Sequence, residues 1–339
     1  MTKARVARRI AMAAAYGGGG IGLLSAGAFG LVRAEAALAR RAIGEPAGTA
    51  PDANGVYGAS QPGEPLTLAL LGDSSATGLG VTDAHQTPGA MLAAGLAEAS
   101  DRPVRLVCSA TVGARSSDLS EQAVVVQEAR PDVAVIMIGA NDVTHRVKPP
   151  TAVRHLDHAV RQLRGAGAEV VVGTCPDLGT VEPVAQPLRW IARRSSRQLA
   201  AAQTIAVVEA GGRTVSLGDL LGPEFEASPK EMFGPDRFHP SAAGYASAAA
   251  ALLPSVCAAL DVWFGTETET TPDLSRGEGV RPIALAAVEA ADEAGTEVAG
   301  AQVGGRDRGP RGRWALLRHR PGRSSNEVEA AATEETPPR

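Results

Sequence analysis

Short apolar runs recur along the middle of the chain, and most of them contain β-branched residues. The runs cover residues 66–71, 104–108, 133–138, 169–173 and 204–208. Near-continuous apolar runs of this length are typical of strands that are buried on both faces of a sheet. The pattern therefore predicts five strands at these positions.

Between these runs, apolar and polar residues alternate at helical spacing. The predicted helices cover residues 88–99, 117–129, 151–165, 188–202 and 241–260. Strands that alternate with helices of this length indicate a parallel sheet with helices on both faces, which is an α/β/α architecture. In such sheets ligands bind beyond the carboxyl ends of the strands, so we expect the functional residues there.

The first part of the chain contains an uncharged stretch, residues 10–32, with four basic residues before it. About 20 such residues can cross the hydrocarbon core of a bilayer. The preceding basic residues favour an inside N-terminus, so we expect a single-pass anchor with an extracytoplasmic catalytic domain. A cleaved secretory signal is one alternative, because Ala26-Gly27-Ala28 and Ala34-Glu35-Ala36 both resemble cleavage sites, and an ordinary buried helix is another.

Composition divides the chain into four segments. We assign residues 1–40 to the anchor or signal, 41–64 to a Gly, Pro and Ala-rich linker, 65–262 to the folded domain and 263–339 to a polar tail expected to be disordered. Within the tail, the Arg-rich patch at residues 306–323 either contacts anionic lipid or is a solvated run of charge.

The overall charge and the cysteines exclude several functions. The formal net charge of −4 does not favour nucleic-acid binding. The three cysteines, Cys108, Cys175 and Cys257, are too few and too widely spaced for a disulfide framework or a zinc site. We expect them to be buried apolar residues, and we predict neither a metal nor a cofactor.

A serine, a histidine and an aspartate could form a nucleophilic site at the predicted sheet edge. Ser74 lies just beyond the first strand, and a serine hydroxyl becomes nucleophilic when a base removes its proton. His239 is the best candidate base, because an imidazole titrates near neutral pH. Asp236, three residues earlier, could hold the required tautomer of that imidazole.

Attack on an ester carbonyl places negative charge on its oxygen, and fixed donors must stabilise that charge. The candidate donors are the backbone N–H groups of Ser74 and Gly113 and the side-chain amide of Asn141. A glycine at position 113 would let the backbone approach closely. We assign supporting roles to Asp73 and Asp142, the latter in bracing its loop.

Together these residues resemble the four motif blocks of the SGNH hydrolases, also called the GDSL esterase/lipase family. The matching blocks are Gly72-Asp73-Ser74, Gly113, Gly139-Ala140-Asn141-Asp142 and Asp236-Arg237-Phe238-His239. The resemblance covers residues 65–260 and implies a flavodoxin-like three-layer sandwich and metal-independent hydrolysis of esters or thioesters. It also implies that Ser74 is the nucleophile, that Gly113 and Asn141 contribute to the oxyanion hole, and that His239 is the base oriented by Asp236.

Two positions depart from the family pattern. Ser75 stands where the family name expects leucine, and Ala110 stands where many members have a further glycine.

From the four matching blocks we expect a serine esterase that acts through an acyl-enzyme on a small-molecule, lipid or glycan ester. The alternative is a catalytically silent binding or scaffold protein at the membrane.

Overall fold

The computed structural model describes residues 30–44, 48–262, 301–303 and 306–308. Most of the expected anchor and of the expected tail, and all but three residues of the Arg-rich patch, therefore lie outside the described residues. The described strands are β1 (Gly55–Tyr57), β2 (Leu66–Gly72), β3 (Val104–Cys108), β4 (Val133–Met137), β5 (Glu169–Gly173), β6 (Arg213–Val215), β7 (Ala301–Val303) and β8 (Arg306–Arg308).

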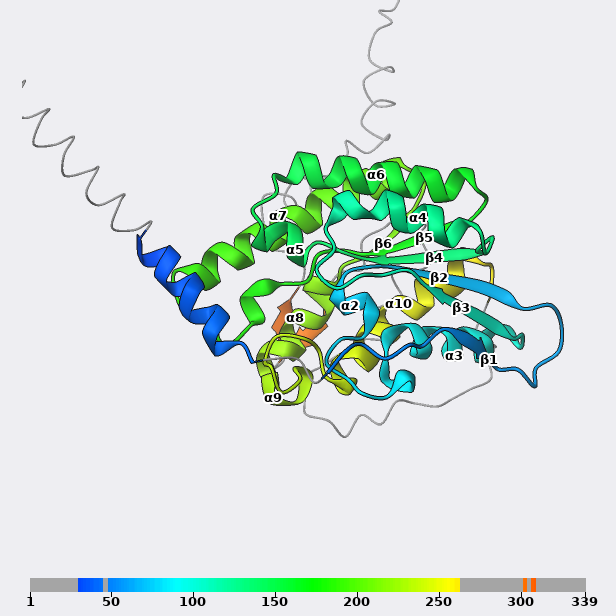
Figure 1. Cartoon of the computed structure of the whole chain (residues 1–339), viewed down its shortest axis with the longest axis horizontal. Helices are drawn as coiled ribbons and strands as arrows, with labels where there is room; N and C mark the ends of the chain where they lie inside the picture. The colour runs from blue at the N-terminus through cyan, green and yellow to red at the C-terminus, as the bar shows by residue number, and fades with distance from the viewer. Residues whose placement is uncertain (1–29, 45–47, 263–300, 304–305, 309–339) are drawn as a thin grey trace, which may run out of the picture.

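Six strands form the central sheet in the order β1-β3-β2-β4-β5-β6 (Figure 1). All neighbours are parallel except β1, which pairs antiparallel with β3. Without β1, the order is 2-1-3-4-5 along the chain, which is the flavodoxin-like order. The predicted three-layer α/β/α fold is confirmed, and the sheet carries one strand more than expected.

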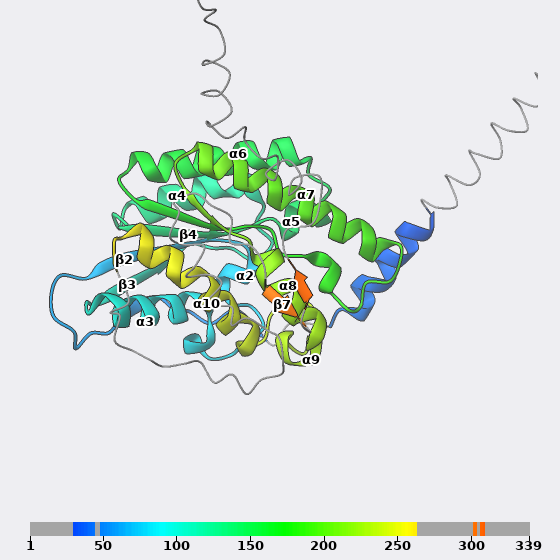
Figure 2. The same ribbon diagram turned by 180° about the vertical axis from the view of Figure 1, so that it is seen from behind.

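Helices cover both faces of this sheet (Figures 1 and 2). The larger helices are α3 (Pro88–Ser100), α4 (Leu119–Gln127), α6 (Pro149–Gly165), α7 (Leu188–Glu209), α8 (Leu217–Ala227) and α10 (Ala242–Ala259). The shorter ones are α2 (Ser74–Thr77), α5 (Ala140–Thr144), α9 (Pro229–Met232), η1 (Ala84–Gln86), η2 (Ser116–Asp118) and η3 (Leu178–Thr180). The predicted helices at 88–99, 117–129, 151–165 and 241–260 correspond to α3, to η2 and α4, to α6 and to α10.

Each face of the sheet has its own hydrophobic core, because side chains alternate along a strand. In β2, Leu68 and Leu70 pack in a cluster with residues of α3, α8 and α10. Ala69 and Leu71 point the other way, into a cluster with residues of α4, α6 and α7. Burial on both faces explains why β2 contains almost no polar side chains, and it fixes the strand end that precedes Ser74.

The predicted fifth strand at residues 204–208 is wrong. These residues belong to α7, which runs to Glu209, and they contribute buried Thr204 and Val207 with the spacing of a helix. The fifth parallel strand is instead β6, which has only three residues and begins with Arg213. Such a short edge strand has no apolar run by which it could be identified.

The expected linker at residues 41–64 contains regular structure. Residues 30–42 are helical, and β1 extends the sheet past β3. In the expected tail, β7 and β8 pair as an antiparallel hairpin, so these six residues differ from the expectation of disorder.

Among the described residues, α10 is long and apolar enough to span a membrane by length and composition. It is a core helix here, because about half of it (56%) is buried inside the protein. Cys175 and Cys257 are buried as expected, whereas Cys108 is only half-buried.

Candidate active site

Ser74 lies at the carboxyl end of β2, where the chain turns sharply into α2. Gly72 has a φ of +139°, and a Cβ at this position would lie 1.9 Å from the carbonyl oxygen of Met137. Only glycine fits this turn. Asp73 then caps α2 by accepting a hydrogen bond from the N–H of Ser75 (2.9 Å). As the first residue of α2, Ser74 has a backbone N–H without a partner inside the helix, which leaves that group available to a ligand.

The structure brings Ser74, His239 and Asp236 together although 165 residues separate the serine from the histidine. The Nε2 atom of His239 lies 3.1 Å from the Oγ atom of Ser74. The Nδ1 atom of the same ring lies 2.6 Å from Oδ2 of Asp236. A base within hydrogen-bonding reach of a hydroxyl, itself oriented by a carboxylate, is the arrangement that activates a serine nucleophile.

The Asp236 carboxylate is fixed by its own turn. Its Oδ1 atom accepts hydrogen bonds from the backbone N–H groups of Phe238 and His239, both at 3.0 Å. Asp236 is almost fully buried, whereas the His239 side chain keeps 13% of its surface exposed. The carboxylate is therefore held rigidly behind an imidazole that can still reach a substrate.

The N-terminal segment contacts this same turn. The backbone N–H of Gly44 donates to the carbonyl oxygen of Asp236 (3.1 Å), and the guanidinium of Arg237 donates to the carbonyl oxygen of Ala42. Arg237 adopts a left-handed conformation with a φ of +59°. The turn that carries the histidine and aspartate is therefore tied to residues almost 200 positions earlier.

Asn141 and Ser74 line the same cavity, at the ends of the neighbouring strands β4 and β2. The side-chain amide of Asn141 donates one hydrogen bond to the carbonyl oxygen of Ala114 (3.0 Å). That bond orients the amide and leaves its second N–H for a ligand. It also ties Asn141 to the loop that contains Gly113.

Gly113 lies in an exposed turn and is absent from the residues that line the cavity around Ser74. A Cβ at this position would meet no atom of the described residues within 4 Å. Its φ of +83° is a left-handed conformation, which favours glycine. The approach of this backbone to a substrate stays a prediction.

The two supporting aspartates are both buried. Burial raises the pKa of Asp73 to about 6, although the hydrogen bonds from Ser75 oppose that shift. Burial also raises the pKa of Asp142, whose carboxylate accepts hydrogen bonds from the N–H and the hydroxyl of Ser116. Asp142 thus connects α5 to η2, on the far side of the Gly113 loop.

One supporting residue was missed by the sequence analysis. Gln122 of α4 is buried, accepts from the N–H of Gly72 (2.8 Å) and donates to its carbonyl oxygen (2.9 Å). This side-chain amide satisfies both backbone groups of the strained glycine before Ser74. A polar residue on the buried stripe of α4, beside Leu119 and Ala123, was the available signal.

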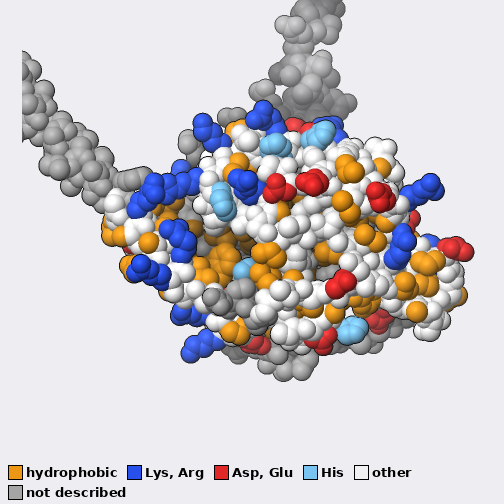
Figure 3. Space-filling view, in the orientation of Figure 1, with side chains coloured by type: hydrophobic (Ala, Val, Ile, Leu, Met, Phe, Trp, Pro, Cys, Tyr) orange, Lys and Arg blue, Asp and Glu red, His pale blue; other side chains and the backbone are white. Residues whose placement is uncertain are grey.

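An apolar cavity of about 100 Å³ opens beside Ser74 and His239. A single water needs roughly 10–15 Å³ measured in this way, so the space admits a small acyl group. The apolar residues of its lining include Leu178, Val181, Leu217, Leu221, Phe225 and Phe233. Figure 3 shows hydrophobic side chains around a hollow in the middle of this face.

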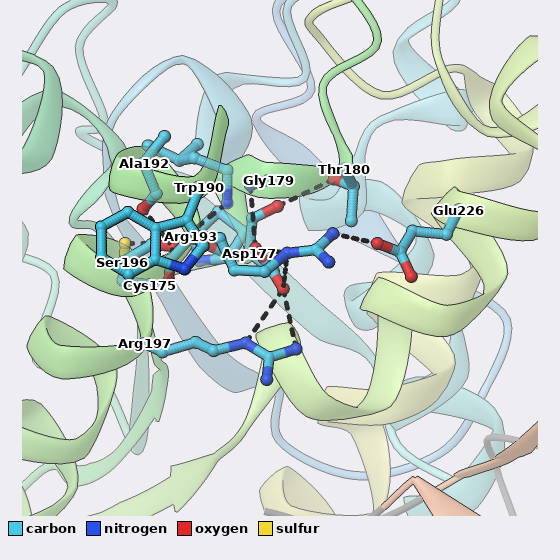
Figure 4. A network of polar contacts seen from close by, with 12 residues as sticks. Cys175, Asp177, Gly179, Thr180, Trp190, Ala192, Arg193, Ser196, Arg197 and Glu226 are labelled. Atoms are coloured by element: carbon cyan, nitrogen blue, oxygen red, sulfur yellow. Dashed lines mark hydrogen bonds and ion pairs between the residues drawn. The ribbon is translucent and has the colours of Figure 1, made fainter. Parts of the chain in front are cut away.

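A further buried carboxylate, Asp177, lies on the wall of the same cavity (Figure 4). Its Oδ2 atom accepts two hydrogen bonds from Arg197 (3.1 and 2.9 Å), and its Oδ1 atom accepts from the N–H of Gly179 (2.8 Å). Arg193 lies 3.2 Å from the same carboxylate and also pairs with Glu226. These ion pairs connect the loop after β5 to α7 and α8.

Among the residues that the structure describes, no three His, Cys, Asp or Glu side chains gather in a way that could hold a metal ion.

Comparison with known proteins agrees with this architecture. The profile of the GDSL-like Lipase/Acylhydrolase family matches residues 70–247. The GDSL-like esterase Rv1075c of Mycobacterium tuberculosis is 42% identical over 276 residues, which cover 78% of this chain and 87% of the relative.

Solved structures are similar to this chain at lower identity. TesA is 25% identical with a TM-score of 0.44, over 57% of this chain and 97% of TesA. Axe2, an acetylxylan esterase from Geobacillus stearothermophilus, is 19% identical with a TM-score of 0.43, over 60% of this chain and 97% of Axe2. With the family profile covering more than half of its length, the chain belongs to the GDSL-like lipase/acylhydrolase family.

Proposed function

We propose that this protein is a serine esterase that cleaves carboxylic esters through an acyl-enzyme on Ser74. The observation that carries the proposal is the continuous set of contacts from Asp236 through His239 to Ser74, at 2.6 and 3.1 Å. His239 accepts the proton of the Ser74 hydroxyl as the oxygen attacks the acyl carbonyl. The same imidazole then protonates the leaving alcohol, and water releases the acid by the reverse sequence.

We assign the oxyanion to donors from three segments: the backbone N–H groups of Ser74 and Gly113 and the side-chain amide of Asn141. The free N–H of the Asn141 amide and its place in the lining of the cavity support this assignment. The protein residues supply every proton transfer in this sequence, so the proposal needs neither a metal nor a cofactor.

The cavity supports an apolar acyl group as the part of the substrate that lies beside Ser74. Its walls include three leucines, three phenylalanines and a valine, and the charge of Asp177 is neutralised by arginines. Burial of an apolar acyl chain there stabilises the complex by roughly 0.8 kcal/mol for each methylene group.

The decisive experiment is the change Ser74→Ala, assayed with a short p-nitrophenyl ester. We expect turnover to fall by roughly 10⁴-fold or more, because the nucleophile is lost while the fold is kept. Ser117→Ala is the matched control, since Ser117 is exposed and its hydroxyl contacts only Asp118. Unchanged turnover in Ser74→Ala would contradict the proposal.

A fluorophosphonate probe tests the alternative of a catalytically silent scaffold. An esterase is labelled in a manner that depends on both Ser74 and His239. Folded protein that takes up no label would instead support a binding role for this fold.

We also propose that the catalytic domain lies on the extracytoplasmic side of a membrane, anchored through residues 10–32. The support is the uncharged stretch with basic residues before it. Alkaline carbonate extraction of membranes tests the anchor, because an integral protein stays in the pellet. Release of a shortened chain into the medium would instead favour the cleaved signal.

A further inference from the structure

The helix at residues 30–42 packs against the catalytic domain through its polar and small side chains. Glu35 is buried and accepts a hydrogen bond from the backbone N–H of Leu188 at the start of α7 (3.0 Å). Ala39, one turn further on, is buried as well. The larger apolar residues of the helix lie at the edge of this packed side and remain exposed.

Leu31 and Leu38 are those residues, with 52% and 61% of their surface exposed. Residues seven apart lie on the same side of a helix, so the two leucines form one exposed stripe, next to the side that carries Glu35 and Ala39. Single exposed leucines are common on protein surfaces and need no explanation. Two on one stripe, in a helix that buries a glutamate instead, do need one.

The start of α7 adds an aromatic residue to this surface. Trp190 is 58% exposed and lies two residues after Leu188, the partner of Glu35. The guanidinium of Arg194 lies 5.8 Å from the centre of the Trp190 ring, within range of a cation–π interaction. An exposed tryptophan beside an arginine is typical of residues at the level of lipid headgroups.

The surface is also basic. Arg40 and Arg41 are exposed on the same helix, and Glu35, the acidic residue of that helix, is turned inward. Figure 3 shows Lys and Arg side chains gathered over the side of the molecule where Figure 1 places this helix and the adjacent end of α7. This concentration contrasts with the net charge of −4 for the whole chain.

We propose that this surface docks on an anionic lipid bilayer. The docking face consists of Leu31, Leu38, Arg41, Trp190 and Arg194. Its leucines and tryptophan enter the headgroup region while its arginines pair with anionic headgroups, each contributing about 1 kcal/mol. The uncharged stretch at residues 10–32 shares its last three residues with this helix, so a bilayer that held the earlier part of the stretch would meet the docking face.

Docking would place the catalytic cavity beside the membrane. Arg193 of α7, three residues after Trp190, contacts Asp177 on the cavity wall (Figure 4). Hydrolysis of esters carried in the bilayer would follow, a consequence that rests on the proposed esterase function. The docking itself does not depend on catalysis.

The test uses the full chain reconstituted into vesicles of phosphatidylcholine, with or without phosphatidylglycerol. The changes Trp263→Phe and Trp314→Phe leave Trp190 as the single tryptophan of the three in the sequence. Lipids brominated on their acyl chains quench tryptophan at short range, so quenching reports contact of Trp190 with the bilayer rather than mere anchoring. We expect quenching in vesicles with phosphatidylglycerol, and we expect it to decrease as salt screens the charges.

Replacing two arginines of the face sharpens the result. Arg41→Gln with Arg194→Gln should lower the ratio of docked to undocked protein by roughly 30-fold. Lys148→Gln with Arg154→Gln removes the same charge from exposed positions on and before α6 and should leave quenching unchanged. Turnover of a soluble ester shows that each variant is folded.

Two outcomes would overturn the docking face. In one, Trp190 stays accessible to acrylamide and unquenched by brominated lipid, although the protein floats with the vesicles. In the other, Trp190 is shielded only at high protein concentration without lipid, which would assign the face to a second copy of the chain. The quenching of Trp190 does not depend on catalysis, so the Ser74→Ala result tests the esterase proposal alone and the quenching result tests the docking proposal alone.

Discussion

Two buried aspartates, Asp236 and Asp177, lie in the surroundings of one cavity, and their partners set them apart. Asp236 contacts the imidazole of His239, a type of side chain that serves as a general base. Asp177 contacts the guanidinium groups of Arg193 and Arg197, a type of side chain that pairs with carboxylates without exchanging protons. The first pair can take part in proton transfer, whereas the second can only hold structure in place.

Asp73 is a third buried carboxylate near the site, and no cation contacts it among the ion pairs of the described residues. Burial raises the pKa of Asp73 to about 6. The three aspartates thus show three ways in which a protein accommodates a buried acid: an imidazole, two guanidiniums, or partial protonation. The same substitution, aspartate to asparagine, should have a different effect at each.

The largest effect is expected for Asp236→Asn. Asparagine keeps the size of the side chain but can donate to Nδ1 of His239, which stabilises the wrong tautomer of the base. We expect kcat to fall by about 10⁴-fold with little change in the melting temperature. Steady-state kinetics on a p-nitrophenyl ester measure this loss, and a loss below tenfold would remove Asp236 from the proposed mechanism.

Asn141→Ala tests whether the uncharged side-chain amide of Asn141 stabilises the oxyanion in the proposed reaction. Loss of one oxyanion donor should reduce kcat by about 100- to 1,000-fold, while KM changes little. The comparison variant is Asn54→Ala, since Asn54 does not line the cavity around Ser74 and its side chain contacts Cys108 instead. Equal kinetics for the two variants would show that the amide of Asn141 only braces the Ala114 loop.

Asp73→Asn should change the pH dependence of stability. In the folded protein the pKa of Asp73 is raised from 3.8 to about 6, so the folded state binds a proton more readily than the unfolded state. The stability that this protonation provides is present below pH 4 and is lost as the pH rises through 6. The shift corresponds to about 3 kcal/mol.

The variant has no such proton to lose. Between pH 4 and pH 7, the free energy of unfolding of the unmodified protein should fall by about 3 kcal/mol relative to that of the variant. Urea denaturation at several pH values gives the difference. Parallel curves for the two proteins would mean that solvent reaches the Asp73 carboxylate.

The smallest effect is expected for Asp177→Asn. Arg193 and Arg197 are each more than 30% exposed, so solvent screens them when the carboxylate is removed. We expect a loss of about 1–3 kcal/mol in stability. The KM for a longer acyl ester should rise while that for an acetate ester stays constant, because the loop with Leu178 and Val181 forms a cavity wall. An equal fall in kcat for both esters would give Asp177 a role in the chemistry.

The parts of the fold that the sequence predicts are those where burial dominates the local pattern. β4 is buried along its whole length between two helical layers, so its residues are all apolar and easy to identify. β6 is a three-residue edge strand, and the neighbouring apolar residues 204–208 imitate a strand while they lie in α7. The distinction depends on tertiary packing rather than on local composition.

The site shows the same division. Gly72, Ser74 and the turn from Asp236 to His239 were predictable because their geometry is local and admits few residue types. The pairing of Asp177 with Arg197 joins residues 20 positions apart across a loop and a helix, and charged residues at such spacing are common on any surface. Tertiary packing, which buries the Asp177 carboxylate, distinguishes this pair from ordinary surface charges.

The contact of Gly44 with the carbonyl of Asp236 bears on how the chain could be matured. Proteolysis after Ala28 would keep the whole helix at residues 30–42, which contacts the start of α7 through Glu35 and leads to the contact of Gly44 with Asp236. Proteolysis after Ala36 would discard Glu35, the acceptor for the start of α7, and would leave a stub of six helical residues ahead of Ile43. A secreted form that retains the contact between Glu35 and the start of α7 would therefore begin at residue 29.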